Sequence, residues 1–148
     1  TMRLADFMEL EMNLRHCLWA AAVAFGMLAG SGCVTSTVSH LPPAEGQKSS
    51  TGVPVVGNLS GSISGIYLFN LIPLWSGSPS RPNRNDYDMF VDHVRKPYLL
   101  QMLDNRARQL DGDGMADAVC REHSTGAFTL WLFWKRTISG TAVAVRKP

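Results

Sequence analysis

Cys33 has the most distinctive chemical setting of any residue in this chain. Its thiol is a nucleophile, and it follows an apolar segment through the small residues Ser31 and Gly32. Small residues let an extended backbone enter a peptidase cleft, which bulky residues would block. After Cys33 the sequence becomes polar and rich in small residues. This setting predicts that the thiol is covalently modified and that the chain is cleaved just before it.

The segment that precedes Cys33 is typical of secretion. A short basic region is followed by an apolar run of 12 residues, 18–29, whereas a membrane-spanning helix needs about 20. A buried core helix is the alternative, but glycines weaken helix formation towards the end of the run. Residues 12–32 therefore resemble a bacterial lipoprotein signal peptide. The resemblance implies a diacylglyceryl group on Cys33. Many lipoproteins that stay in the inner membrane have Asp directly after this cysteine, whereas this chain has Val34, which implies the periplasmic face of the outer membrane.

The segments on either side of this signal are expected to lie outside the folded domain. Residues 1–11 carry acidic side chains that do not suit the leading region of a signal, so we expect an upstream extension and a true start at Met12. Residues 33–56 are small and polar, and they cannot bury enough apolar area to offset the entropy cost of ordering. We therefore expect a lipidated flexible tether at 33–56 and a domain over 57–148.

An acidic turn that contains glycines is the second group with possible chemistry. Its carboxylates belong to Asp111, Asp113 and Asp117. Calcium binds oxygen ligands, and glycine permits the tight turn of a calcium loop. Aligned with such a loop, however, the first and twelfth positions hold Gln109 and Cys120, which are not the expected ligands. We expect a turn in which Gly112 or Gly114 ends a helix in the left-handed conformation, with a metal site as the alternative.

Cys120 and His123 are the third group. Successive side chains of a strand point to opposite faces, so two residues three positions apart do not bind one ion without a bend. We expect a buried thiol and a surface imidazole, and a metal site at these two residues belongs to the same alternative. No residue lies in the spacing of a known catalytic motif, so we expect no enzymatic activity, no catalytic residue and no cofactor.

Hydropathy patterns predict the elements of the first part of the domain. Residues 57–75 alternate and then become continuously apolar, as in a strand, and residues 76–85 form a loop. A helix begins after Asn85 and is interrupted by Pro97, which predicts a kink or break near Lys96. Its apolar stripe is expected to contain Tyr87, Phe90, Val94, Leu99, Leu103, Ala107 and Leu110.

Three short strands are predicted to follow, at residues 115–122, 127–136 and 139–145. The last two are expected to be joined by a tight turn at 137–138. The predicted fold class is therefore α+β. It is a small two-layer α/β sandwich in which an antiparallel sheet packs on one amphipathic helix that is kinked at Pro97.

The order of these elements resembles a known family. An amphipathic helix is followed by the acidic turn into Ala-Asp-Ala-Val at 116–119, and a hairpin closes on Gly-Thr-Ala-Val at 140–143. This arrangement resembles the YbjQ-like family of small bacterial domains, which is often labelled as heavy-metal-binding. The resemblance covers about residues 57–145, and it implies a compact α/β fold that assembles into rings.

The apolar strand at residues 128–134 predicts self-association. Alternation places Trp131 and Phe133 on one face of the strand and other apolar residues on the opposite face. A helix covers one face, and a bare aromatic patch on the other would favour aggregation, so we expect a homo-oligomer interface at Trp131 and Phe133. The alternative is internal, with two halves of a broken helix covering both faces of a monomer.

Charge and composition limit the remaining functions. The 116 residues from Cys33 onwards carry twelve Lys and Arg against nine Asp and Glu, which is too weak and too scattered for nucleic-acid binding. We expect no intramolecular disulfide in the mature chain, because Cys33 is predicted to be acylated and only Cys120 follows it. We expect a lipid-anchored binding or assembly module of the cell envelope, with a metal-binding envelope lipoprotein as the alternative.

Overall fold

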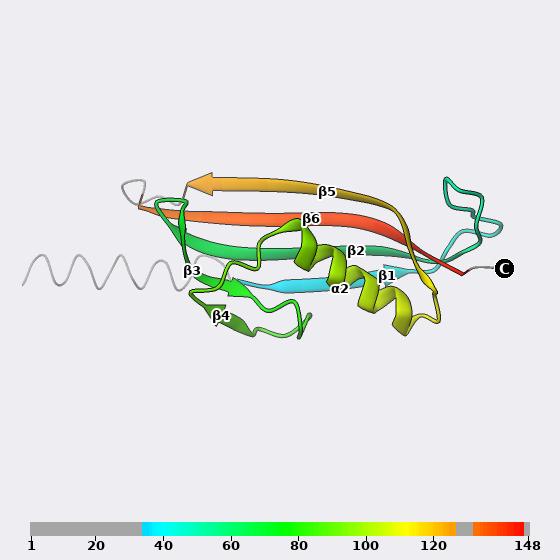
Figure 1. Ribbon diagram of the computed structural model, residues 1–148, viewed down its shortest axis with the longest axis horizontal. Coiled ribbons are helices and arrows are strands. Elements are labelled where there is room, and N and C mark those ends of the chain that lie inside the picture. Colours follow the sequence, from blue (N-terminus) through cyan, green and yellow to red (C-terminus); the bar gives the residue numbers. More distant parts are fainter. Residues whose placement is uncertain (1–33, 127–131, 147–148) are drawn as a thin grey trace, which may run out of the picture. The chain divides into compact units, whose positions relative to one another are not determined.

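The structure, a computed structural model, describes residues 34–126 and 132–146 (Figure 1). The described residues belong to one compact unit, Val34–Pro148. The described elements are β1 (Ser36–Leu41), β2 (Val55–Leu68), β3 (Ile72–Gly77), β4 (Tyr87–Met89), α2 (Lys96–Gln109), β5 (Gly114–Gly126) and β6 (Phe133–Val145). The strands form an antiparallel sheet and α2 packs against it, which confirms the predicted α+β class.

β2 is the central strand of the sheet. It pairs with β6 along one edge, and with β1 and then β3 along the other. β5 lies outside β6, and β4 lies outside β3. Figure 1 shows β2, β6 and β5 running side by side as three long strands. These strands set the length of the domain and carry the helix.

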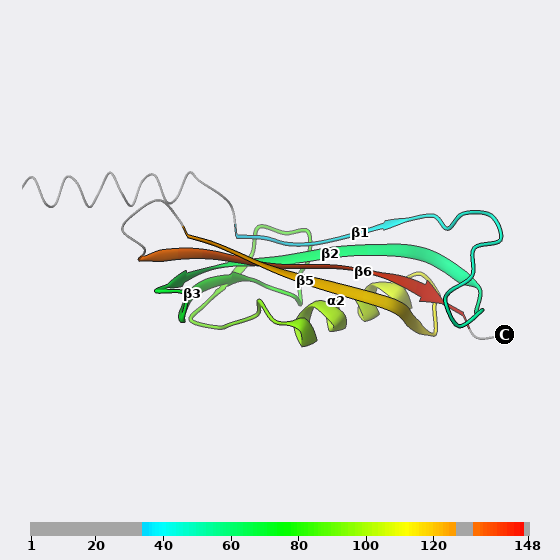
Figure 2. The same cartoon turned by 90° about the horizontal axis from the view of Figure 1, so that it is seen from above.

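α2 lies on one face of the sheet, close to β2 and β6 (Figure 2). Glycines make this approach possible. A Cβ atom added at Gly61 would lie 3.0 Å from Met102 Cε, and one added at Gly65 would lie 2.9 Å from Val94 Cγ2. The close approach buries large aliphatic side chains between α2 and the sheet, and each of them contributes about 1.5–3 kcal/mol to the stability of the fold. The core residues are Val38, Leu59, Ile63, Tyr67, Val94, Leu99, Met102, Leu103, Ala107, Ile138, Ala142 and Ala144.

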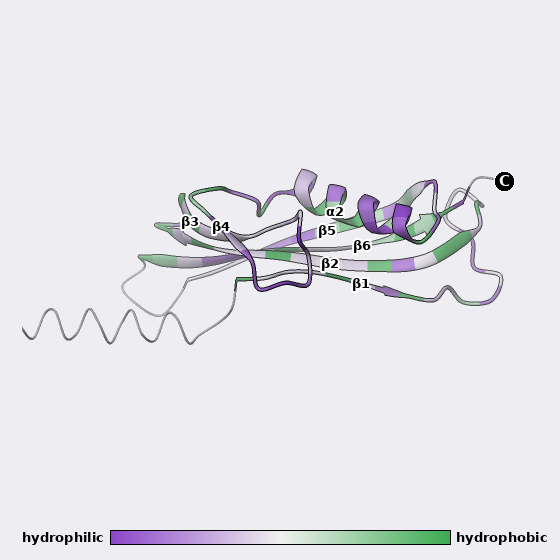
Figure 3. Ribbon diagram, turned by 90° about the horizontal axis from the view of Figure 1, so that it is seen from below, coloured by the Kyte–Doolittle hydropathy of each residue, from purple (hydrophilic) through white to green (hydrophobic). Residues whose placement is uncertain are grey.

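The face of the sheet away from α2 is largely polar. Ser60 and Ser62 of β2 lie opposite Thr141 and Ser139 of β6, and Thr37 Oγ1 lies 2.9 Å from Ser62 Oγ. Figure 3 shows hydrophobic and hydrophilic stretches alternating along β2, and hydrophilic residues along α2. The alternation follows from the two-residue period of a strand, with apolar and glycine positions towards the helix and hydroxyl groups away from it.

The expected flexible tether at 33–56 contains a strand. β1 pairs with residues 58–63 of β2, and just before β1 the Thr35 carbonyl accepts a hydrogen bond from Ser64 N at 2.9 Å. Val38 is buried against the core. The prediction of a tether is therefore wrong over β1. Its β-branched residues suit a strand, and β2 satisfies its backbone groups, a long-range pairing that local composition does not reveal.

The helix begins at Lys96, later than predicted. Tyr87–Met89 is strand β4, and the backbone is still extended at Arg95, with φ −136° and ψ 149°. Pro97 stands in the first turn of α2, where an N–H group has no helical partner to lose. The predicted start after Asn85 and the predicted kink are both wrong, because the proline begins the helix instead of interrupting it.

β6 is continuous where a turn was predicted. Its pairing with β2 runs without a break through Ser64↔Thr137 and Ile63↔Ile138. The predicted turn at 137–138 is wrong, because β-branched Thr and Ile favour strands and avoid the positive φ values of tight hairpin turns. β5 is also longer than predicted and runs to Gly126. Residues 127–131 of the predicted middle strand lie outside the described residues.

Gly77 offers a test of how β1 is held. A Cβ atom at Gly77 would lie 2.5 Å from the carbonyl carbon of Thr35 and 2.7 Å from Ser36 N, so Gly77→Ala must displace the start of β1. We expect the free energy of unfolding in urea to fall by about 1–3 kcal/mol. Gly114→Ala is the control, since nothing lies within 4 Å of its added Cβ. Equal stability of the two variants would contradict the placement of β1.

Candidate functional site

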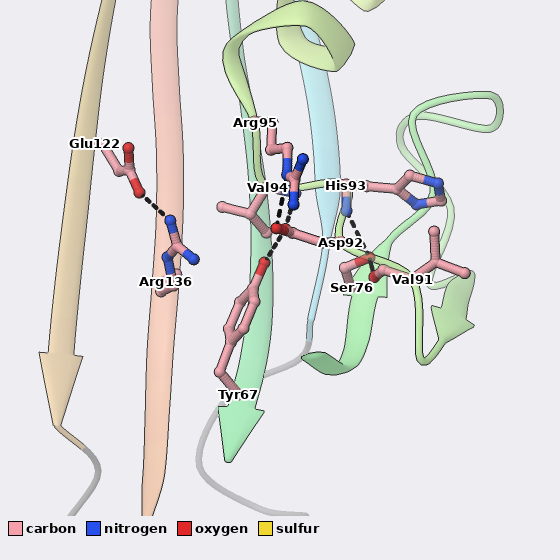
Figure 4. Close-up of polar contacts among 9 residues, drawn as sticks. All are labelled: Tyr67, Ser76, Val91, Asp92, His93, Val94, Arg95, Glu122 and Arg136. Carbon is pink, nitrogen blue, oxygen red and sulfur yellow. Dashed lines mark hydrogen bonds and ion pairs between the residues drawn. The ribbon is translucent and has the colours of Figure 1, made fainter. Parts of the chain in front are cut away.

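A connected group of polar side chains lies where the chain passes from β4 to α2 (Figure 4). It joins Tyr67 of β2, Asp92 and Arg95 of the segment before the helix, and Arg136 of β6. Glu122 of β5 pairs with Arg136. We call these five residues the clamp. Because they come from four segments, the clamp ties the start of α2 to three strands.

Tyr67 is the buried centre of the clamp. Its side chain is fully buried, and Arg136 Cζ lies 4.8 Å from the centroid of its ring. Its hydroxyl group donates a hydrogen bond to Asp92 Oδ1. Burial, and then the hydrogen bond and charge of Asp92, raise the pKa of Tyr67 well above its usual range. The phenol therefore stays protonated and acts as a hydrogen-bond donor.

Asp92 is the charged partner of Tyr67. Its carboxylate also accepts hydrogen bonds from Val94 N at 3.2 Å and from Arg95 Nε at 2.8 Å. Burial alone would raise the pKa of Asp92, but the hydrogen bonds from Tyr67 and Arg95 outweigh it and lower that pKa. Asp92 is therefore an anion near the N-terminus of α2, where negative charge is favourable. This matters because the N-cap, Arg95, provides no side-chain cap hydrogen bond.

A second set of contacts holds the same segment against β3 and α2. Ser76 Oγ donates to the Val91 carbonyl at 2.8 Å and accepts from His93 N at 3.3 Å. His93 Nδ1 lies 3.3 Å from Asp88 Oδ2. The His93 and Tyr98 rings pack edge-on, with 4.9 Å between their centroids. The segment before α2 is thus fixed on both sides.

The clamp is suited to holding structure. Tyr67 has no exposed surface, the Asp92 carboxylate already has three donors, and a guanidinium group keeps its proton. Activation of a nucleophile would need a base with free access to a substrate. The geometry therefore supports a structural role for the clamp.

The acidic turn ends α2 in a Schellman arrangement. Asp111 N donates to the Arg108 carbonyl at 3.2 Å, and Gly112 N donates to the Ala107 carbonyl at 3.0 Å. The left-handed residue is Asp111, with φ 57°, so the prediction that Gly112 or Gly114 would adopt this conformation is wrong. Gly112 serves a different purpose, because a Cβ atom there would lie 3.0 Å from the Ala107 carbonyl oxygen.

The candidate metal ligands of the acidic turn are not gathered into a site. Asp117 lies at a bulge in β5, with φ 53°, and its carboxylate accepts hydrogen bonds from the hydroxyl and the backbone N–H of Ser50. These hydrogen bonds lower the pKa of Asp117. Asp113 N donates to the Val145 carbonyl at 2.9 Å. In the part of the chain that the structure describes, no three His, Cys, Asp or Glu residues, Asp111 included, could hold a metal ion together.

Cys120 and His123 lie on opposite faces of β5. Cys120 packs against the core beneath α2, and its Sγ would lie 3.3 Å from a Cβ atom added at Gly140. His123 is exposed, and its Nε2 lies 2.9 Å from Thr125 Oγ1. The two side chains therefore do not point towards a common ion.

The other predicted site residues are only partly described. Cys33 and Trp131 lie outside the described residues. Phe133 is the first residue of β6, is partly buried, and lies opposite Leu68 of β2. The next residue, Trp134, packs against the core, so alternation places Phe133 on the face away from α2.

Sequence reasoning missed an exposed apolar group at one end of the sheet. We call Phe69, Leu71, Ile72 and Phe90 the apolar tip. Their exposed fractions are 55%, 80%, 51% and 68%. The first three surround the connection between β2 and β3, and Phe90 N donates to the carbonyl of Leu74 in β3. Phe90 was assigned to a helical stripe, and no local pattern marked the connection as exposed.

Comparison of the chain with protein-family models, with curated proteins and with solved structures finds no match. Membership of the YbjQ-like family therefore stays a prediction. Residues 34–126 and 132–146 contain no helix with the length and hydrophobicity to cross a membrane.

Tyr67→Phe isolates the central hydrogen bond of the clamp. The variant keeps the ring beneath Arg136 and removes the donor to Asp92, so we expect the free energy of unfolding at neutral pH to fall by about 1–2 kcal/mol. The folded-state pKa of Asp92 is lowered, so its stabilising contribution is present above the unfolded pKa of about 3.9. The cost of Tyr67→Phe should therefore shrink as the pH falls through the folded-state pKa of Asp92.

Tyr87→Phe is the matched control, because Tyr87 lies on β4 and is 58% exposed. Its free energy of unfolding should stay within about 0.5 kcal/mol of wild type. Urea denaturation across the acidic range measures both variants. A cost of Tyr67→Phe that is equal at every pH would show that the hydrogen bond does not act through the Asp92 charge.

Proposed function

We propose that this protein is a lipid-anchored, non-enzymatic binding or assembly module of the bacterial cell envelope. It is attached through Cys33 and faces the periplasm from the outer membrane. The observation that carries the proposal is that the folded unit starts at Val34, directly after the predicted acylation site. Only Val34 and Thr35 separate Cys33 from β1, so a lipid on Cys33 would hold the domain against the bilayer.

The sequence before the domain supports this attachment. An apolar run too short to span a membrane leads through small residues to Cys33. A single acyl chain binds membranes only marginally, whereas a diacylglyceryl group together with an amide-linked chain gives stable anchoring.

A binding role agrees better with the arrangement of side chains than a catalytic role does. The clamp is committed to holding α2, and we propose a two-layer α/β sandwich whose polar sheet face and apolar tip remain for partners. The resemblance to the YbjQ-like family, with its ring assemblies, supports the same role. The metal-binding alternative has less support, since Ser50 engages Asp117 and the side chains of Cys120 and His123 diverge.

Acylation is tested by incorporation of radiolabelled palmitate in a bacterial host. We expect label in the wild-type protein and in Cys120→Ser, and none in Cys33→Ser. Uptake of label is the decisive readout, because an uncleaved apolar run can keep Cys33→Ser in the membrane fraction. Wild-type protein without label, or equal label in Cys33→Ser, would contradict the proposal.

Self-association is tested at Phe133 by light scattering of the protein extracted in mild detergent. Trp131 and Phe133 are proposed to meet the same residues of a second copy, so Phe133→Lys should convert an oligomer into a monomer. Val119→Lys adds the same charge at a residue of β5 that is 57% exposed, and should leave the assembly unchanged. A wild-type monomer would rule out self-association. Unfolding of Phe133→Lys would favour an internal cover for this face.

A further inference from the structure

We infer that the apolar tip inserts into the surface of the phospholipid bilayer that carries the lipid of Cys33. The domain is then held at the membrane at two points, the acylated N-terminus and the tip. This inference rests on the proposed lipid anchoring and adds a second, non-covalent contact with the same bilayer.

The tip is built on a strained turn. Leu71 N donates to the Leu68 carbonyl at 3.0 Å, and the two residues between them, Phe69 and Asn70, have φ values of 52° and 59°. This is the backbone of a hairpin turn with two central residues of positive φ, for which Asn and Gly are well suited. Asn70 fits its position, whereas the bulky Phe69 does not.

Phe90 is a second bulky residue of the tip with a positive φ. Its φ is 58°, it is more than half exposed, and its N–H binds the Leu74 carbonyl beside Ile72. A bulky residue with positive φ is a genuine outlier, and such strained residues cluster at functional sites. Two exposed phenylalanines at one end of a sheet gain little from folding, because their rings are not in the core. Their rings are therefore available to an apolar phase outside the protein.

The position of the chain start identifies that phase as the bilayer. The carbonyl of Thr35 accepts from Ser64 N, and Leu68 at the tip lies four residues further along β2, a distance of roughly 13 Å. Figure 2 shows that β1 begins in the half of the sheet that carries the β2–β3 connection, away from the C-terminus. A lipid attached to the residue before Val34 is therefore within reach of the plane that the tip would enter.

Charge behind the tip suits phospholipid headgroups. Lys135 lies opposite Ile66 of β2, two residues before Leu68, so a basic residue stands behind the apolar residues along the strands. Nearby carboxylates are already paired, Asp92 with Arg95 and Glu122 with Arg136. Apolar residues ahead of a basic residue match the order of acyl chains and anionic headgroups across a membrane surface.

Fluorescence quenching in vesicles tests the insertion. The full-length chain carries Leu71→Cys or Leu41→Cys with Cys17→Ser and Cys120→Ser, and the new thiol is labelled with nitrobenzoxadiazole. Leu41 is the control, since it is 68% exposed and apolar but ends β1 at the other end of the sheet. The protein is reconstituted in vesicles of phosphatidylethanolamine and phosphatidylglycerol with brominated acyl chains. We expect quenching at position 71 and none at position 41.

Mass spectrometry of the same sample reports separately whether Cys33 is acylated. Equal quenching at both positions, or no quenching at position 71 in acylated protein that sediments with the vesicles, overturns the tip contact and leaves the anchor intact. An unacylated Cys33 would also take up the label and contradicts the proposed anchoring. Stronger quenching in the Leu71→Cys protein than in the Leu41→Cys protein would then still support the tip contact, because the label at Cys33 is common to both. A label at position 71 that is shielded from water but not quenched by the brominated chains would indicate that protein, and not lipid, covers the tip. This result would also overturn the inference.

Asparagine variants separate membrane contact from folding. Asn tolerates positive φ, so Phe69→Asn with Phe90→Asn should relieve strain while it removes both rings. We expect quenching at position 71 to fall about tenfold, with a thermal unfolding midpoint equal to or above that of wild type. Leu41→Asn should change neither quantity. A lower midpoint together with lost quenching would show that the rings serve the fold, and would overturn the inference.

Discussion

The structure depends on how closely α2 approaches the sheet. Gly61 and Gly65 of β2 and Gly140 of β6 lie beneath the helix, and an added Cβ atom at each would come within 3.1 Å of a side chain from α2 or the segment before it. Interiors are close-packed, so this spacing leaves no room for larger residues. The contact buries Leu99, Leu103 and Ala107 completely. It also fixes where each end of the helix must meet the strands.

Both ends of α2 are then held by polar groups. At the start, Asp92 links the Tyr67 hydroxyl to the segment that leads into the helix. At the end, Asp111 takes up the left-handed conformation and Gly112 allows the chain to turn into β5. The polar contacts at both ends of α2 therefore serve the fold. We propose that function belongs to surfaces outside these contacts, namely the polar sheet face and the apolar tip, with the chain attached to the membrane at Cys33.

The parts of the fold that the sequence predicts are those set by local periodicity. The helical stripe of Leu99, Leu103 and Ala107 is buried as expected, and the predicted α+β class is confirmed. The errors arise where a distant partner decides the outcome. β1 is a strand because β2 satisfies its backbone, and Pro97 is tolerated because the helix starts beside it. The clamp had no local signal, since residues far apart in the chain form it. The tip was missed because the apolar run at 57–75 was expected to form a buried strand, whereas a turn interrupts it after Leu68.

The central claim is that Cys33 carries the lipid that places this domain at a membrane. The most direct test is the intact mass, with fragment sequencing, of the protein extracted from bacterial membranes. We predict a chain that begins at Cys33, with a diacylglyceryl thioether on its sulfur and an acyl chain on its amino group. A mature chain that begins elsewhere, or an unmodified Cys33, would contradict the account.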